Sequence, residues 1–241
     1  MLRLLSAQQS TGAGYGGALL KQLTETVAAH PQVLTLSDEI YEHIVYDGER
    51  HVPTLAVAPQ LRARILTVNG VSKAYAMTGW RIGYAGGPEW LASTMAKVQS
   101  QTSGKSSTIG QAAAEAALQG DQSSIAEWRG ILERRRDAII AALSKSGWLS
   151  VSTPAGAFYV FVDVGRCIGL TAPHGTVMGS DLDLSSYLLD KADVATVAGE
   201  AFGASPFLRL SFAADDTDVL ETARRIVGAL DRLVPSGATG R

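Results

Sequence analysis

Apolar residues recur along the chain with two periods, one typical of helices and one typical of buried strands. Over the first 120 residues these patterns alternate, as in an α/β domain. The expected helices span residues 18–29, 88–101 and 111–118, and the expected strands span residues 32–36, 64–68 and 82–87. The first of these strands is expected to be buried and parallel to its neighbours. Three apolar side chains are expected on the inner face of the second helix: Leu91, Met95 and Val98.

Beyond residue 120 the pattern changes to one long helix followed by several short strands. The long helix is expected at residues 124–144, and its charged run at residues 133–137 is expected to be a solvated face. The remaining strands are expected at residues 149–152, 157–162, 194–197 and 206–212, and the remaining helices at residues 184–191 and 216–233. A glycine-rich stretch at residues 165–180 is expected to be a surface loop. Helices that frame a small sheet predict an α+β domain.

Composition narrows the class of protein without defining its function. A chain of 241 residues that is 46% apolar can bury a sizeable core in one large domain or two small ones. A net charge of −2 gives no electrostatic argument for binding nucleic acid or an anionic membrane. The single cysteine, Cys167, excludes a disulfide within the chain and fits a reducing compartment. The apolar run at residues 1–6 is too short for a signal peptide, and no stretch approaches a membrane span.

The candidate chemistry centres on Lys73, which follows the strand at residues 64–68 in a turn rich in glycine and serine. A partly desolvated lysine has a lowered pKa and can act as a nucleophilic amine toward a carbonyl. Arg81, later in the same segment, carries a guanidinium fork that suits a phosphate. The residues of this segment alone are equally compatible with a surface lysine on a turn.

A second candidate segment lies at the carboxyl end of the strand at residues 32–36, where ligands bind in open α/β sheets. It contains Asp38 and Tyr41. The alternative for Asp38 is the N-cap of a short helix that begins at Glu39. Glu39 and Glu42 are expected to be solvated, and the nearby residue His43 is expected to pack or to face solvent.

Arg209 lies in the middle of the strand expected at residues 206–212, where a charge requires a partner. One interpretation is an outward-facing arginine on an edge strand, which is the polar half of a period-two pattern. The other is a bidentate clamp for a carboxylate.

Three segments, which follow one another along the chain in the family's order, resemble the fold-type I aminotransferases that depend on pyridoxal phosphate (PLP). The resemblance is specifically to the bacterial aspartate aminotransferase-like branch of class I. Residues 72–81 resemble the family's PLP lysine segment, SKAYAMTGWR in this chain. Residues 37–42, SDEIYE, resemble its segment at the pyridine nitrogen and ring oxygen, and residues 207–213, FLRLSFA, resemble its substrate-carboxylate segment. The similarity extends from about Thr11 to about Leu233 and lacks the family's first half, which implies a C-terminal portion.

The resemblance implies an α/β fold in which residues 1–120 form the end of a mainly parallel PLP-binding sheet domain. A small α+β C-terminal domain at residues 121–234 and a flexible tail at residues 235–241 would follow. Lys73 would be the catalytic residue and Schiff-base lysine, with further cofactor contacts from Asp38, Tyr41, Ser72 and Arg81, and a substrate contact from Arg209. The implied substrates are an amino acid, aspartate-like or aromatic, and a 2-oxo acid. A homodimer in the cytoplasm is expected, without a metal, nucleic acid or membrane partner.

The sequence departs from the family pattern at three places. Gln9 and Ser10 replace an Asn-Pro pair whose asparagine bonds the ring oxygen of the cofactor, and Gln9 is one methylene longer. Gly70 stands where a phosphate-binding serine or threonine is common, so Ser72 and backbone N–H groups could take over part of that task. Residues 104–105 replace an Asn-Pro pair in a loop that, in relatives, reaches toward the partner subunit.

Other functions remain open on these residues. A carbon–sulfur lyase or a decarboxylase on the same fold would use the same lysine. A catalytically impaired fragment would bind a partner or do nothing, and its sheet would leave an exposed edge that can pair with other chains. A nucleotide-binding domain is disfavoured because no glycine-rich fingerprint follows a strand and opens a helix.

Overall fold

The computed structural model describes residues 2–6 and 14–235, which fall into two compact units. Unit 1 contains residues 2–6, 14–130 and 155–157, and unit 2 contains residues 131–154 and 158–235. The division lies within helix α5 (Ser123–Leu143). Gln9 and the tail beyond residue 235 lie outside the described residues.

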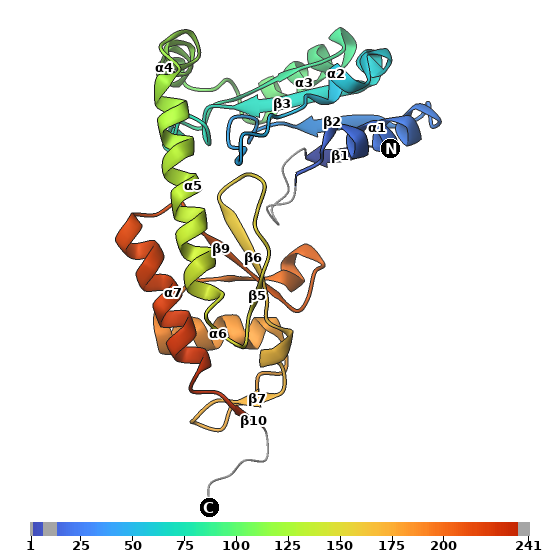
Figure 1. Ribbon diagram of the computed structural model, residues 1–241. Helices are drawn as coiled ribbons and strands as arrows, with labels where there is room; N and C mark the ends of the chain where they lie inside the picture. Colours follow the sequence, from blue (N-terminus) through green and yellow to red (C-terminus); the bar gives the residue numbers. More distant parts are fainter. Residues whose placement is uncertain (1, 7–13, 236–241) are drawn as a thin grey trace, which may run out of the picture. The chain divides into compact units, whose positions relative to one another are not determined.

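Unit 1 is built on a four-stranded sheet in the order β1-β2-β3-β4 (Figure 1). These strands are β1 (Leu2–Ser6), β2 (Leu34–Asp38), β3 (Ile65–Gly70) and β4 (Gly83–Gly86). β1, β2 and β3 are parallel, and β4 runs antiparallel to β3. The prediction of a mainly parallel sheet with the β2 segment inside it is therefore confirmed.

The helices of unit 1 lie close to their expected positions. They are α1 (Gly17–Ala28), the short α2 (Thr54–Val57), α3 (Glu89–Thr102), α4 (Thr108–Gln119) and the first part of α5, with 3₁₀ turns η1 (Pro59–Arg64) and η2 (Thr78–Trp80). α3 begins directly after Pro88, whose fixed φ suits a helix start. Ser107 is the N-cap of α4, and its hydroxyl accepts a hydrogen bond from the N–H of Gly110.

The expected inner face of α3 is not buried. Met95 is 41% exposed and Val98 is 59% exposed, whereas Leu91 is partly buried, and no residue of this helix is fully buried within the described structure. The neighbouring β4 is exposed at all its positions and pairs, within the described chain, with β3 only. Periodicity correctly predicts that the helix has an apolar stripe, but it contains no information on which element covers that stripe.

Unit 2 is an antiparallel sheet with helices, as expected for an α+β domain (Figure 1). The sheet order is β5 (Ser150–Val151), β6 (Tyr159–Asp163), β9 (Phe207–Ser211), β8 (Val197–Ala198). The helices are the second part of α5, α6 (Asp181–Ala192) and α7 (Asp216–Leu230), and a two-stranded ribbon pairs β7 (Leu170–Thr171) with β10 (Val234–Pro235). Their apolar faces share a core that includes Leu143, Leu184, Leu188, Leu210 and Leu230.

Two expectations for unit 2 are only partly right. The charged run in α5 is not simply a solvated face, because Arg136 is only 3% exposed and donates to the carboxylate of Asp137 and to the carbonyl of Pro154. Residues 165–180 are not simply a surface loop, because they contain the 3₁₀ turn η3 (Gly165–Cys167), strand β7 and the fully buried Met178. The charged neighbours of Arg136 and the glycines around Met178 gave no indication in the sequence that these two residues are buried.

Cys167 is buried, as a packed thiol should be. Burial, with a smaller contribution from Asp163, raises the pKa of its thiol to about 11. The thiol is therefore protonated at neutral pH and is a poor nucleophile. Within the described parts of the chain, no helix is long and apolar enough to cross a membrane.

Substitution by alanine should have opposite effects on stability at two glycines of unit 2, Gly199 and Gly228. A Cβ at Gly199, in the 3₁₀ turn η4 (Gly199–Phe202), would lie 2.0 Å from the carbonyl oxygen of Ala204, whereas a Cβ at Gly228 in α7 would meet nothing within 4 Å. We expect Gly199→Ala to lower the free energy of unfolding by about 2 kcal/mol through overpacking. We expect Gly228→Ala to raise it by about 0.5–1 kcal/mol, because alanine favours the helix. Urea denaturation of both variants measures this, and equal midpoints would contradict the packing described.

Candidate active site

The site begins where two neighbouring parallel strands end. Asp38 is the last residue of β2, and its register partner in β3 is Val68. β3 ends at Gly70, and the chain then enters the turn that carries Ser72 and Lys73. Because the two strands are parallel and in register, both segments emerge at the same edge of the sheet. The structure thus brings the two candidate segments of unit 1 together.

Lys73 and Tyr41 meet at this edge. The Nζ atom of Lys73 lies 5.8 Å from the centroid of the Tyr41 ring, within the range of a cation–π contact. The lysine turn is held by backbone contacts, because the N–H of Ala76 donates to the carbonyl of Lys73 at 3.3 Å. The hydroxyl of Thr78 donates to the carbonyl of Ser72 at 3.0 Å and closes the same turn. Lys73 is half-buried in this turn.

Asp38 is half-buried and is held by its own segment. Its Oδ1 atom accepts a hydrogen bond from the N–H of Ile40 at 3.2 Å. Residues 40–43 form a turn and not a helix, so Asp38 caps a turn and does not begin the short helix considered as its alternative role. The Asp38 carboxylate thus stays at the end of β2, beside β3, which leads into the lysine turn.

Arg81 follows η2 in a left-handed backbone conformation with φ of 56°. Its side chain is exposed, and its Nη1 atom donates to the carbonyl of Thr78 at 3.1 Å. This contact ties Arg81 to the turn of Lys73, because Thr78 also closes that turn. The guanidinium has further donors for an anion.

Gly70 is suited to the close approach of β3 and β4. A Cβ atom at this position would lie 2.9 Å from the carbonyl oxygen of Ile82 and 3.1 Å from the Cα of Gly83. A serine or threonine, which is common here in the family that the sequence resembles, would require the backbone to shift. The departure at Gly70 is therefore matched to the local packing of the sheet.

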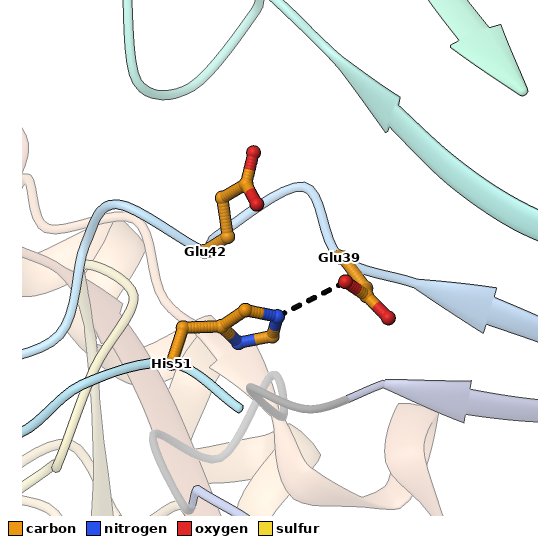
Figure 2. Close-up of side chains that lie close together, drawn as sticks. All are labelled: Glu39, Glu42 and His51. Atoms are coloured by element: carbon orange, nitrogen blue, oxygen red, sulfur yellow. Dashed lines mark hydrogen bonds and ion pairs between the residues drawn. The ribbon is translucent and has the colours of Figure 1, made fainter. Parts of the chain in front are cut away.

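The expectation that Glu39 is solvated is wrong, because Glu39 is only 4% exposed. Figure 2 shows its carboxylate directed at the ring of His51, with Oε2 3.1 Å from Nε2. Glu42 is partly exposed and accepts a hydrogen bond from Asn69 at 2.6 Å, so it is only partly solvated. His43 is partly exposed. The period-two pattern of β2 could have indicated the burial of Glu39, because Glu39 shares a face with the buried Thr35 and Ser37.

Arg209 lies in unit 2, where it is held between two aromatic rings. Its Cζ atom is 4.4 Å from the centroid of the Tyr159 ring and 4.4 Å from that of Phe202. β9 pairs with both β6 and β8, so the interpretation of Arg209 as a residue of an edge strand is wrong. Stacking on two rings restricts the guanidinium to few orientations, which suits recognition of a planar carboxylate.

The donor set of unit 1 fits PLP. The site edge offers an amine at Lys73, a carboxylate at Asp38, a phenol at Tyr41, a hydroxyl at Ser72 and a guanidinium at Arg81. A phosphorylated pyridine aldehyde has a matching aldehyde, ring nitrogen, ring oxygen and phosphate. Gln9, which stands in place of the family's ring-oxygen asparagine, lies outside the described residues.

Comparison with known proteins identifies the family. The family model described as aminotransferase class I and II matches residues 4–227. An aspartate aminotransferase from Rhizobium meliloti (strain 1021) is 47% identical over 230 residues, which cover 95% of this chain and 56% of that protein. An aspartate/prephenate aminotransferase from Cereibacter sphaeroides is 43% identical over 92% of this chain and 55% of its own length. The chain thus spans little more than half the length of these relatives.

Solved structures show the same relationship. The crystal structure of the aspartate aminotransferase from Rhizobium meliloti matches with a TM-score of 0.93 and 46% identity, covering 97% of this chain and 58% of that one. An aromatic aminotransferase from Pyrococcus horikoshii matches with a TM-score of 0.85 and 32% identity, covering 95% and 60%. The resemblance carried by the three sequence segments is confirmed, and the chain belongs to the aminotransferase class I and II family.

Proposed function

We propose that this chain carries the PLP-binding lysine of an aminotransferase. The enzyme would transfer an amino group between an amino acid, aspartate-like or aromatic, and a 2-oxo acid. The observation that supports this most strongly is the convergence of Lys73 and Tyr41 beside the end of β2, where Asp38 lies, in a member of this family. Relatives named as aspartate, aspartate/prephenate and aromatic aminotransferases support the choice of substrates.

Lys73 has two roles in this proposal. PLP, when bound, supplies an aldehyde that reacts with amines and a pyridine ring that withdraws electrons. The Nζ atom of Lys73 would hold the cofactor at its aldehyde carbon until a substrate amine takes that place. Once free, the amine of Lys73 would move a proton from the Cα atom of the substrate to C4′, first as general base and then as general acid.

The other residues of unit 1 hold the cofactor. Asp38 keeps a proton on the ring nitrogen, since a neighbouring carboxylate favours the cationic form of that nitrogen. Tyr41 donates its hydroxyl to the ring oxygen. Arg81 and Ser72 bind the phosphate, together with backbone N–H groups of the glycine-containing turn.

Arg209 binds the α-carboxylate of the substrate in this proposal. Its placement between the rings of Tyr159 and Phe202 supports the role, because a guanidinium held on both faces presents its donors edge-on. Two parallel N–H···O bonds to a carboxylate would then orient the substrate.

We further infer a homodimer in the cytoplasm. The exposed apolar side chains of α3, which include Met95 and Val98, support an additional contact surface on unit 1. The single cysteine fits a reducing compartment.

A lyase or decarboxylase would use the same lysine, so the products discriminate among these reactions. We expect the purified chain, supplied with PLP and a panel of amino acids, to form the matching 2-oxo acid only when an acceptor 2-oxo acid is present. Release of ammonia, a thiol or carbon dioxide would assign the chain to one of the alternatives. The absence of every product, with PLP bound, would indicate a catalytically impaired fragment.

The first variant prediction concerns the covalent link to the cofactor. After borohydride reduction in the presence of PLP, mass spectrometry should find the cofactor mass on the peptide that contains Lys73. Lys73→Ala should abolish this modification, whereas Lys97→Ala, at an exposed position of α3, should leave it unchanged. A yellow, borohydride-sensitive adduct that persists in Lys73→Ala would show that another lysine carries the chemistry.

The second variant prediction concerns Asp38. Asp38→Asn removes the negative charge beside the ring nitrogen, so we expect PLP to bind about tenfold more weakly, as for the loss of a charged hydrogen bond. The same change at Asp190, an exposed residue of α6, should leave the dissociation constant unchanged. Fluorescence titration with PLP measures both, and equal affinities would remove Asp38 from the site.

A further inference from the structure

Glu39, which directly follows Asp38, faces away from the proposed cofactor contact. Successive side chains of a strand point to opposite faces, and the end of β2 follows this rule, because Ser37 and Glu39 are buried while Asp38 between them is half-buried. Glu39 therefore lies on the opposite side of the segment from the proposed cofactor contact. A buried carboxylate costs free energy unless it is fully hydrogen-bonded, so its partners define its role.

The Glu39 carboxylate has partners on both oxygens. Oε1 accepts from the hydroxyl of Ser37 at 3.0 Å and from the N–H of Thr54 at 3.1 Å. Oε2 lies 3.1 Å from Nε2 of His51 (Figure 2), and because an ionised carboxylate only accepts, Nε2 carries the proton. The hydroxyls of Ser37 and Thr54 also lie 2.7 Å apart. Three separate pieces of chain, the end of β2, the loop at His51 and the start of α2, thus meet at one carboxylate.

These contacts fix the turn that carries the proposed ring contacts. The N–H of Glu39 donates to the carbonyl of Val68 in β3 at 2.9 Å, and the N–H of Ile40 donates to Asp38. Further along, Asn69 holds Glu42 at 2.6 Å. The turn from Asp38 to Glu42 is therefore anchored at both ends, and a shift of Glu39 would move the Asp38 carboxylate with it.

We propose that the buried pair of Glu39 and His51 positions Asp38 against the ring nitrogen of PLP by fixing this turn from its far side. Both are positioning residues and do not touch the cofactor. The inference depends on the proposed function, since it assigns Asp38 to the ring nitrogen.

A metal site is the competing interpretation of the same side chains. Glu39, Glu42 and His51 place ligand atoms within 4.8 Å of one another. The hydrogen bonds argue against a metal, because Glu39 is occupied on both oxygens, His51 Nε2 is protonated toward it, and Glu42 accepts from Asn69. We therefore expect no change in melting temperature when ZnCl₂ or EDTA is added. A zinc-dependent rise that disappears in Glu39→Gln would replace the positioning role with a ligand role.

The pair also predicts a pH dependence of stability. Burial alone would raise the pKa of the Glu39 carboxyl, but hydrogen bonds from His51, the N–H of Thr54 and Ser37 together hold this pKa below its ordinary value of 4.5. Glu42 is the other ionisable group in the cluster. A lowered folded-state pKa stabilises the fold above pH 4.5 and loses that contribution as the pH falls through the folded-state value. Glu39→Gln should therefore destabilise the chain at pH 7 and less so at pH 4, as measured by urea denaturation, and an equal effect at both would contradict an ionised, hydrogen-bonded Glu39.

The test of positioning uses the absorption of bound PLP as a function of pH. A protonated ring nitrogen disfavours a second positive charge at the Lys73 nitrogen. Weaker contact with Asp38 would let the ring nitrogen lose its proton and remove that repulsion. The Lys73 nitrogen would then keep its own proton to higher pH, which raises the midpoint of the absorption change. We expect His51→Leu to raise the midpoint by about 0.5–1 pH unit, in the same direction as Asp38→Asn. His51→Gln, which keeps an N–H donor near Nε2, should restore most of the wild-type value. His30→Leu, the same substitution at the exposed end of α1, should leave it unchanged.

The outcomes separate the two proposals. If the wild-type chain forms no covalent link with PLP at Lys73, the proposed function fails. If it does, and Asp38→Asn moves the midpoint while His51→Leu does not, the positioning role alone is overturned. Should His51→Leu not fold, Ser37→Ala removes one hydrogen bond to Glu39 from within the network, and its midpoint should also rise. An unchanged midpoint in folded Ser37→Ala would then contradict the proposal.

Discussion

The parallel register of β2 and β3 is the constraint on which the proposed cofactor site depends. Asp38 pairs with Val68, so both strands end at the same edge of the sheet and release their chains in the same direction. The lysine turn and the aspartate turn are separated along the sequence, and only this register makes them neighbours. A slip of one residue would turn Asp38 to the opposite face and exchange it with Glu39, which would place the proposed ring contact in the buried network.

The buried side of that edge is as polar as its open side. Hydrogen bonds among four side chains hold this strand end, where apolar contacts are more usual: those of Ser37, Glu39, His51 and Thr54. Both carboxylate oxygens of Glu39 have a partner. Directional hydrogen bonds define a backbone position more narrowly than apolar contacts do. A site that must hold a carboxylate at a fixed position benefits from such support, whereas a hydrophobic core would tolerate small shifts.

Much of this arrangement could be predicted from the sequence. The strand–helix alternation, the parallel β2 and the small sheet framed by helices in the second half followed from the hydrophobic pattern, and the lysine segment was recognisable from its residues and its resemblance to a family. The burial of Glu39 could have been predicted from the alternation that buries Thr35 and Ser37, but nothing local indicated its partner His51. The burial of Arg136 was missed because a charged residue in a charged run has no local signal for a partner distant in sequence, such as the carbonyl of Pro154. The exposure of α3 was missed for a related reason, because an apolar stripe does not specify what covers it. The Arg209 stacking depends on Phe202, which follows a separate strand, and no periodicity connects them.

Lys73, Asp38 and the phosphate-binding groups are proposed to act on one ligand. Titration of the purified chain with PLP and, in parallel, with pyridoxal, which lacks the phosphate, tests this proposal most directly. Visible absorption should show saturation at one equivalent of PLP, and pyridoxal should bind at least about tenfold more weakly, because it cannot use the charged hydrogen bonds of Arg81. Unsaturable, equal responses to both aldehydes would instead mean that exposed lysines react without a built site.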